Sequence, residues 1–202
     1  MTPLHFAARH GHFLICRLML EKIDDKNPKS SDDVSGYTPL HEAAENNHLA
    51  ICRLIMKCVS DKSPKDTFGW TPLHYASEKG HLAVCLYIIT NIKDKNPKDA
   101  SGETPLHIAV AKGHNEICHL IIEYAEEKNP SNEAGNTPFH VAAECGNVDI
   151  CQLMAENIDE DLPREDNGYT PLHVAAESGQ LTDRGTYPQL PTQPKKNCSG
   201  SN

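Results

Sequence analysis

Histidine and cysteine are the residues of this chain best suited to chemistry, and most of them recur at a fixed interval. Imidazole and thiolate groups bind zinc and act as bases or nucleophiles. Six of the twelve histidines end a T-P-L-H or T-P-F-H tetrapeptide, and five of the eight cysteines share one later register. The histidines are His5, His41, His74, His107, His140 and His173, and the cysteines are Cys16, Cys52, Cys85, Cys118 and Cys151.

The spacing of these residues argues against a metal site or a catalytic cluster. Successive tetrapeptides start 36, 33, 33, 33 and 33 residues apart. Such a period predicts a stack of repeated units, in which equivalent atoms lie about 8–10 Å apart. Zinc ligands, by contrast, all lie about 2 Å from one ion. No G-x-S-x-G, Walker, H-E-x-x-H or C-x-x-C motif is present. We therefore expect no metal, no cofactor and no enzyme. An autonomous enzyme, the alternative from another class, would need a convergent polar site.

Each interval contains signals for two helices that would position these side chains. In the third interval Thr71 is a suitable N-cap, Pro72 fits the first helical position, and Gly80 ends the helix. A second, apolar helix around Cys85 follows, which predicts that the register cysteines are small buried hydrophobes. One alanine register predicts a close contact between helices; it comprises Ala7, Ala43, Ala76, Ala109, Ala142 and Ala175.

The full pattern, D-x-x-G-x-T-P-L-H-x-A-A-x-x-G-H followed by an apolar helix, resembles the ankyrin repeat over about residues 1 to 181. The resemblance implies an all-α repeat solenoid of antiparallel helix pairs with short β-hairpin fingers, in which each motif histidine bonds near its threonine and to the next repeat. It also implies protein binding on a concave surface of fingers and first helices. The expected repeats are about 1–32, 33–65, 66–98, 99–131 and 132–164, with a sixth, incomplete copy at 165–181.

This chain departs from the family pattern where the second helix should end in Gly-Ala-Asp. Its glycine register holds Ile23, Val59, Ile92, Ala125 and Ile158. We therefore expect the second helix to end differently. The pattern also lacks dedicated caps at either end, which favours a piece of a longer array. Three asparagines (Asn27, Asn96 and Asn129) occupy the register in which the resemblance implies asparaginyl hydroxylation, which stays a possible modification.

Aromatic residues cluster in the registers of the expected binding surface. Tyr37, Phe68 and the only tryptophan, Trp70, fall in neighbouring fingers, and Tyr75 falls on the adjoining helix. Large aromatic side chains on projecting loops are typical anchors of protein interfaces. The charged residues expected to set specificity are Glu45, Glu78, Lys79, Glu103 and Lys112, with Glu42 as a further acidic spot. The alternative is that Phe68 and Trp70 pack against neighbouring fingers.

Charge and composition narrow the class of partner. Residues 1–100 carry 13 basic and 12 acidic side chains, whereas residues 101–202 carry 6 and 16. An acidic half argues against nucleic acid and anionic membranes. No apolar run could span a bilayer, no signal-peptide layout is present, and the cysteines lack a secreted framework. We expect a cytoplasmic, or alternatively nuclear, monomer that acts as a scaffold for a protein partner.

Two further hypotheses stay open. Residues 182–202 form a tail rich in Pro, Ser and Gly that we predict to be disordered. Its P-x-x-P-x-K segment at 191–196 has the form of an SH3 ligand, with a plain solvated tail as the alternative. The array itself could instead be a structural or regulatory segment of a larger protein, such as a channel, a kinase or a ubiquitin-ligase adaptor.

Overall fold

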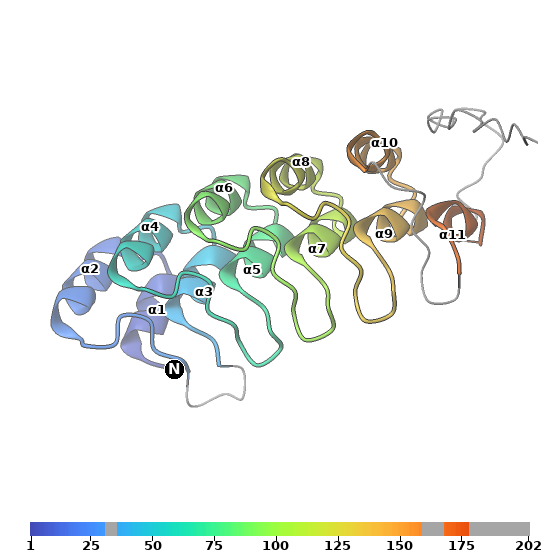
Figure 1. The fold of residues 1–202 in the computed structure, drawn as a ribbon. Coiled ribbons are helices and arrows are strands. Elements are labelled where there is room, and N and C mark those ends of the chain that lie inside the picture. The colour runs from blue at the N-terminus through green and yellow to red at the C-terminus, as the bar shows by residue number, and fades with distance from the viewer. Residues whose placement is uncertain (31–35, 159–167, 178–202) are drawn as a thin grey trace, which may run out of the picture.

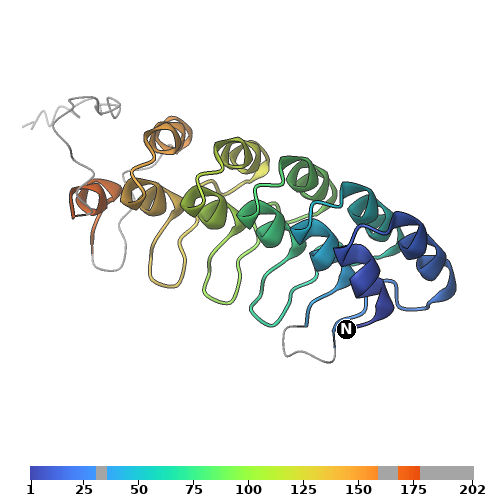
Figure 2. The same ribbon diagram turned by 180° about the vertical axis from the view of Figure 1, so that it is seen from behind.

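The described chain is a single row of helix pairs, seen in a computed structural model that describes residues 1–30, 36–158 and 168–177 (Figure 1). Short first helices form one layer, longer second helices form another, and loops project from the opposite side of the first layer (Figures 1 and 2). The first helices are α1 (Pro3–Arg9), α3 (Pro39–Glu45), α5 (Pro72–Glu78), α7 (Pro105–Ala111), α9 (Pro138–Glu144) and α11 (Pro171–Glu177). The second helices are α2 (Phe13–Lys22), α4 (Leu49–Cys58), α6 (Leu82–Asn91), α8 (Asn115–Tyr124) and α10 (Val148–Asn157). The expected all-α repeat solenoid is confirmed.

Helix ends follow the sequence signals. Thr71 is the extended N-cap of α5 and Pro72 occupies its first turn. Beyond the helix, Gly80 has φ +75°, and Asn47 takes the same left-handed conformation in its repeat with φ 62°. A Cβ on Gly80 would also lie 2.8 Å from Cε1 of His114. The glycine is therefore required both for its backbone conformation and for the packing of the next repeat.

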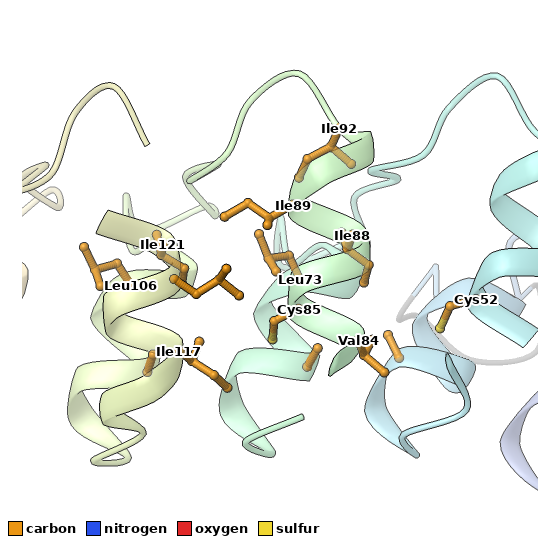
Figure 3. Close-up of a cluster of buried hydrophobic side chains, with 14 of the residues drawn as sticks. Cys52, Leu73, Val84, Cys85, Ile88, Ile89, Ile92, Leu106, Ile117 and Ile121 are labelled. Carbon is orange, nitrogen blue, oxygen red and sulfur yellow. The ribbon is translucent and has the colours of Figure 1, made fainter. Parts of the chain in front are cut away.

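The core is a continuous apolar layer between the two sets of helices. Val84, Cys85, Ile88 and Ile89 of α6 are fully buried, and Figure 3 places them beside the neighbouring repeats. Five members of the predicted alanine register are buried, whereas Ala175 in the last helix is half-buried; the five are Ala7, Ala43, Ala76, Ala109 and Ala142. Burial raises the pKa of the Cys85 thiol to about 12. This thiol stays protonated at neutral pH and behaves as a core hydrophobe.

Two of the second helices, α2 and α6, are capped by a lysine at the end where the family pattern usually has a glycine. The chain leaves α6 at Ile92 in an extended conformation, and the Ile92 side chain is buried in the core. Lys95 then turns its ammonium back to donate to the carbonyls of Ile89 (2.7 Å) and Ile92 (2.6 Å). Lys26 makes the equivalent bonds at the end of α2. A cation here satisfies orphan carbonyls and complements the helix dipole, so these two helices end without the glycine of the family pattern.

The projecting loops are here called fingers, and the three at 66–70, 99–103 and 132–136 each turn around one acidic or amide side chain. In the finger at 66–70, Oδ1 of Asp66 accepts from the backbone N–H groups of Phe68 (2.9 Å) and Trp70 (2.8 Å). Asp99 and Asn132 do the same in the fingers at 99–103 and 132–136. The expected hairpin path is present, but the described residues contain no assigned strand. Two backbone bonds close this finger, from Asp66 N to Trp70 O and from Gly69 N to Asp66 O, and these are too few for a ladder.

The motif histidines link each repeat to the next. Nδ1 of His41 accepts from the backbone N–H of Thr38 (3.1 Å). The ring proton must therefore lie on Nε2, which donates to the Trp70 carbonyl (3.1 Å). His74 bonds the Glu103 carbonyl in the same way, and His107 bonds the Asn136 carbonyl. The histidine role that the resemblance implied is confirmed.

No helix in residues 1–30, 36–158 or 168–177 combines the length and apolarity that crossing a bilayer requires.

We predict that acid unfolds the array through these histidines. Burial lowers the pKa of His41, His74 and His107 to about 4, from 6.5. The unfolded chain therefore binds more protons between these values, so stability is full above pH 6.5 and falls toward pH 4. Between these pH values each such histidine lowers the free energy of unfolding by about 1.4 kcal/mol for every unit by which the pH falls. Urea unfolding at pH 7.5, 6 and 5 measures the slope.

The matched variants are His107→Gln and His119→Gln. His119 is exposed on α8, so its replacement should leave the slope unchanged, whereas His107→Gln should reduce it and also lower stability at pH 7.5. Equal slopes for both variants and the original chain would contradict the linkage.

A second prediction compares two isoleucines that occupy equivalent positions on the second helices, Ile51 in an inner repeat and Ile15 in a terminal one. Ile51 is 1% exposed and Ile15 is 47% exposed. Ile51→Ala should lower the free energy of unfolding by about 2–5 kcal/mol because it leaves a cavity. Ile15→Ala should cost less than about 1 kcal/mol because its side chain already meets solvent. Chemical denaturation measures both values, and similar losses would show that the core is not shared between repeats as described.

Candidate partner-binding groove

The fingers and first helices bound one side of the array (Figure 2). Three of the predicted aromatic side chains, Tyr37, Trp70 and Tyr75, contact one another there. Tyr75 stands at the centre of the cluster. Its ring is 4.9 Å from that of Tyr37, edge on, and 4.9 Å from that of Trp70. The fingers thus bring together three aromatic side chains that lie up to 38 positions apart in the sequence.

Tyr37 is a correction to the sequence prediction, because it is buried rather than exposed. Only 8% of this residue is accessible. Its ring stacks on His41, and its hydroxyl donates to Oε2 of Glu45 (2.6 Å). Burial and the Glu45 carboxylate raise the pKa of Tyr37 above its ordinary value. Tyr37 therefore supports Tyr75 from beneath and offers no surface to a partner.

The sequence left two interpretations of Phe68 and Trp70 open: packing against a neighbouring finger, or exposure to a partner. The structure gives a different answer for each residue. Trp70 is half-buried: its ring stacks on His74, and Nε1 donates to Oδ2 of Asp99 in the next finger (3.0 Å). Phe68 is 64% exposed. The packing interpretation therefore applies in part to Trp70, whereas Phe68 is free to contact a partner.

Tyr75 is fixed by a second carboxylate. Its hydroxyl donates to Oδ2 of Asp66 (2.7 Å), and the same carboxylate also holds the finger turn. Burial and Asp66 raise the pKa of Tyr75. Sequence reasoning missed Asp66 and Asp99 as site residues, although they are the acidic residues of the D-x-x-G-x signature.

These side chains surround an open cavity of about 590 Å³ between two fingers. Its lining residues are Thr67, Phe68, Trp70, Tyr75, Asp99, Ala100 and Ser101. The cavity walls do not depend on flexible side chains alone, because Ala100 N donates to the Phe68 carbonyl (3.0 Å) and joins the fingers. A Cβ on Gly69 would lie 2.6 Å from Ala100 N. The glycine is what allows the two fingers to approach.

Four of the predicted charged residues form a row along the ends of the first helices. Lys79 lies 3.6 Å from Glu45 and 3.3 Å from Glu78, and Lys112 lies 3.6 Å from Glu78. The hydrogen bond to Glu78 raises the pKa of Lys79. Exposed pairs of this kind contribute little to stability, so these groups can exchange partners readily. Glu103 stands apart from the row, on the next finger, where it accepts from Asn132 (3.4 Å).

Glu42 does not form the exposed acidic spot that the sequence suggested. It is fully buried, and the guanidinium of Arg9 in the preceding repeat donates a hydrogen bond to each of its two carboxylate oxygens, both at 2.8 Å. The hydrogen bond to Glu42 in turn raises the pKa of Arg9. The bidentate pair locks the first two repeats together and adds no free charge to the groove.

The three register asparagines have a structural role. Oδ1 of Asn27 accepts from Leu40 N, Oδ1 of Asn96 from Leu106 N, and Oδ1 of Asn129 from Phe139 N, at 3.0–3.2 Å. Each therefore satisfies an orphan N–H in the first turn of the next helix. Their hydroxylation stays a prediction.

Two remaining expectations concern a metal site, which the sequence argued against, and the tail. Residues 1–30, 36–158 and 168–177 hold no group of three His, Cys, Asp or Glu side chains that could bind a metal ion. The tail at 182–202, with its SH3-type segment, lies outside the described residues, and the repeat boundaries stay a prediction.

Comparison with known proteins identifies the repeat. A family model described as ankyrin repeats (3 copies) matches residues 1–66, 52–132 and 125–183. A search of curated proteins found no match. The matched segments together span most of the chain and contain every helix described above. The motif, the helix pairs and the histidine bonds agree with that match. The chain belongs to the ankyrin repeat family.

Proposed function

We propose that this chain is a protein-interaction module that binds its partner in the groove between the fingers and first helices of repeats two to four. Phe68, Trp70 and Tyr75 would supply the contact surface, and Tyr37 would support it from below. The rim that sets specificity would comprise Glu45, Glu78, Lys79, Glu103 and Lys112. Ankyrin repeats are in general protein-interaction modules, and this chain offers no catalytic constellation in its described part.

The exposure of Phe68 is the observation that carries the proposal. A phenylalanine at the tip of a loop gains little by remaining 64% exposed. Burying it against a partner would be favourable, and aromatic side chains in the centre of an interface often contribute most of the binding energy. Trp70 and Tyr75 are already held by hydrogen bonds to Asp99 and Asp66. A partner would therefore meet a preformed surface, with little loss of conformational freedom.

A second candidate function rests on the first repeat. Phe6, Leu14, Ile15 and Leu18 are 47–62% exposed there, whereas Ile51, which shares the register of Ile15, is buried against its neighbour. This apolar face favours a structural or regulatory segment of a larger protein, in which another repeat or domain covers it. The two candidates use different surfaces and do not exclude each other.

Phe68→Ala tests the first candidate. We expect it to weaken capture of partners from a cell extract at least tenfold, because truncation of a central aromatic costs more than about 1.4 kcal/mol. Quantitative affinity capture with mass spectrometry measures the loss. Leu86→Ala is the matched control, since Leu86 is 45% exposed on α6, away from the fingers.

Both variants should have the melting temperature of the original chain, because neither side chain is buried. The proposal is contradicted if Phe68→Ala captures every protein in the same amount as the original chain. Depletion by Leu86→Ala instead would place the binding surface on the second helices.

A further inference from the structure

We infer that the groove at Phe68 accepts an arginine side chain presented by an extended segment of the partner. This inference rests on the proposed function and names the chemistry of the ligand. It concerns the cavity between the fingers at 66–70 and 99–103, where three aromatic rings and one carboxylate line the same space.

The aromatic lining is the first argument. Cations are attracted to the faces of tryptophan, tyrosine and phenylalanine rings, and arginine is the side chain found there most often. Phe68 and Trp70 belong to one finger, and Tyr75 stands behind them on α5. A guanidinium could therefore stack on one ring while its aliphatic stem covers another.

The unbalanced negative charge is the second argument. Asp66 and Asp99 accept hydrogen bonds only from neutral donors: backbone N–H groups, the Ser101 hydroxyl, the Tyr75 hydroxyl and the Trp70 indole. Among the described residues, no lysine or arginine forms an ion pair with either carboxylate. Their hydrogen-bonding capacity is used, but their charge is not neutralised.

The lysines next to these carboxylates in sequence are directed elsewhere. Lys65 precedes Asp66, yet its ammonium donates to the Lys98 carbonyl (2.6 Å). Lys98 precedes Asp99, and its ammonium donates to the Ser131 carbonyl (2.7 Å). The chain thus leaves an aromatic cavity beside two carboxylates with no cation of its own. A cationic ligand would complement that charge.

Arginine fits this site better than lysine. The guanidinium group is planar and weakly hydrated, so it stacks on aromatic rings at a small desolvation cost. A lysine ammonium is compact and strongly hydrated. The cavity is open on one side, so the ligand side chain would keep part of its hydration while contacting Asp99.

Trp70 is the only tryptophan in the chain and lines the cavity, so its fluorescence reports binding directly. The probes are three capped pentapeptides of alanine with arginine, lysine or citrulline at the centre. Citrulline has nearly the shape of arginine but no charge. We expect saturable quenching by the arginine peptide, with affinity about fivefold higher than that of the citrulline peptide and higher than that of the lysine peptide.

Asp99→Asn is the decisive variant, because Asn132 holds the next finger with the same turn bonds. It should preserve the fold and reduce the preference for arginine over citrulline, because only the Asp66 carboxylate keeps its charge beside the rings. Glu133→Gln is its control: it removes one negative charge from an exposed position on the finger at 132–136. This control should keep the preference. Thermal melting of both variants checks that the array remains folded.

Several outcomes would overturn the inference. These are equal affinity for arginine and citrulline peptides, tighter binding of the lysine peptide, an unchanged preference in Asp99→Asn, and no quenching up to about 10 mM peptide. If any of these outcomes is found while Phe68→Ala still reduces the capture of proteins, arginine recognition is refuted but the proposed function is not. Loss of that Phe68 dependence would refute the proposed function itself.

Discussion

The rest of the structure depends on one interaction, the bridge that each buried motif histidine makes between repeats. Its Nδ1 accepts from the backbone of its own N-cap threonine, and its Nε2 donates to a carbonyl at the base of the next finger. The ring can do both only when neutral, and burial lowers the pKa of His41, His74 and His107 so that these rings stay neutral. Because the acceptor carbonyl of His41 belongs to Trp70, the bridge that joins two repeats also fixes the backbone of a groove residue.

Packing in this array takes place between neighbouring repeats. Each of the inner first helices α3, α5, α7 and α9 contacts the first helices on either side and its own second helix. Terminal registers therefore lose a neighbour, as the exposed Ile15 illustrates beside the buried Ile51. The Arg9–Glu42 pair strengthens the first junction, where a buried carboxylate without its guanidinium would be strongly destabilising. The stability of such an array is a sum of repeats and junctions.

The groove combines residues that support with residues that are available for contact. Tyr37 and the two finger carboxylates hold Tyr75 and Trp70 in place, and Phe68 projects beyond them. Asp66 and Asp99 serve two purposes at once, since each folds its own finger and also brings negative charge to the aromatic rings. Asn132 folds its finger equally well without a charge. The structural role of this register therefore does not require the carboxylate.

The sequence alone determined the repeat, the helix pairs, the left-handed residues after the first helices and the buried cysteine register. Each of these follows from local backbone preferences and a period that repeats them. The burial of Tyr37, the pairing of Glu42 with Arg9 and the lysine caps were decided by the tertiary structure. The first two depend on which way a long side chain turns once the next repeat is in place, and the lysine caps depend on how the loop turns back toward its own helix. A register position does not specify these directions. The same holds for the groove: the sequence brought its aromatic residues into neighbouring fingers, but only the packing of one finger on the next left Phe68 exposed beside two uncompensated carboxylates.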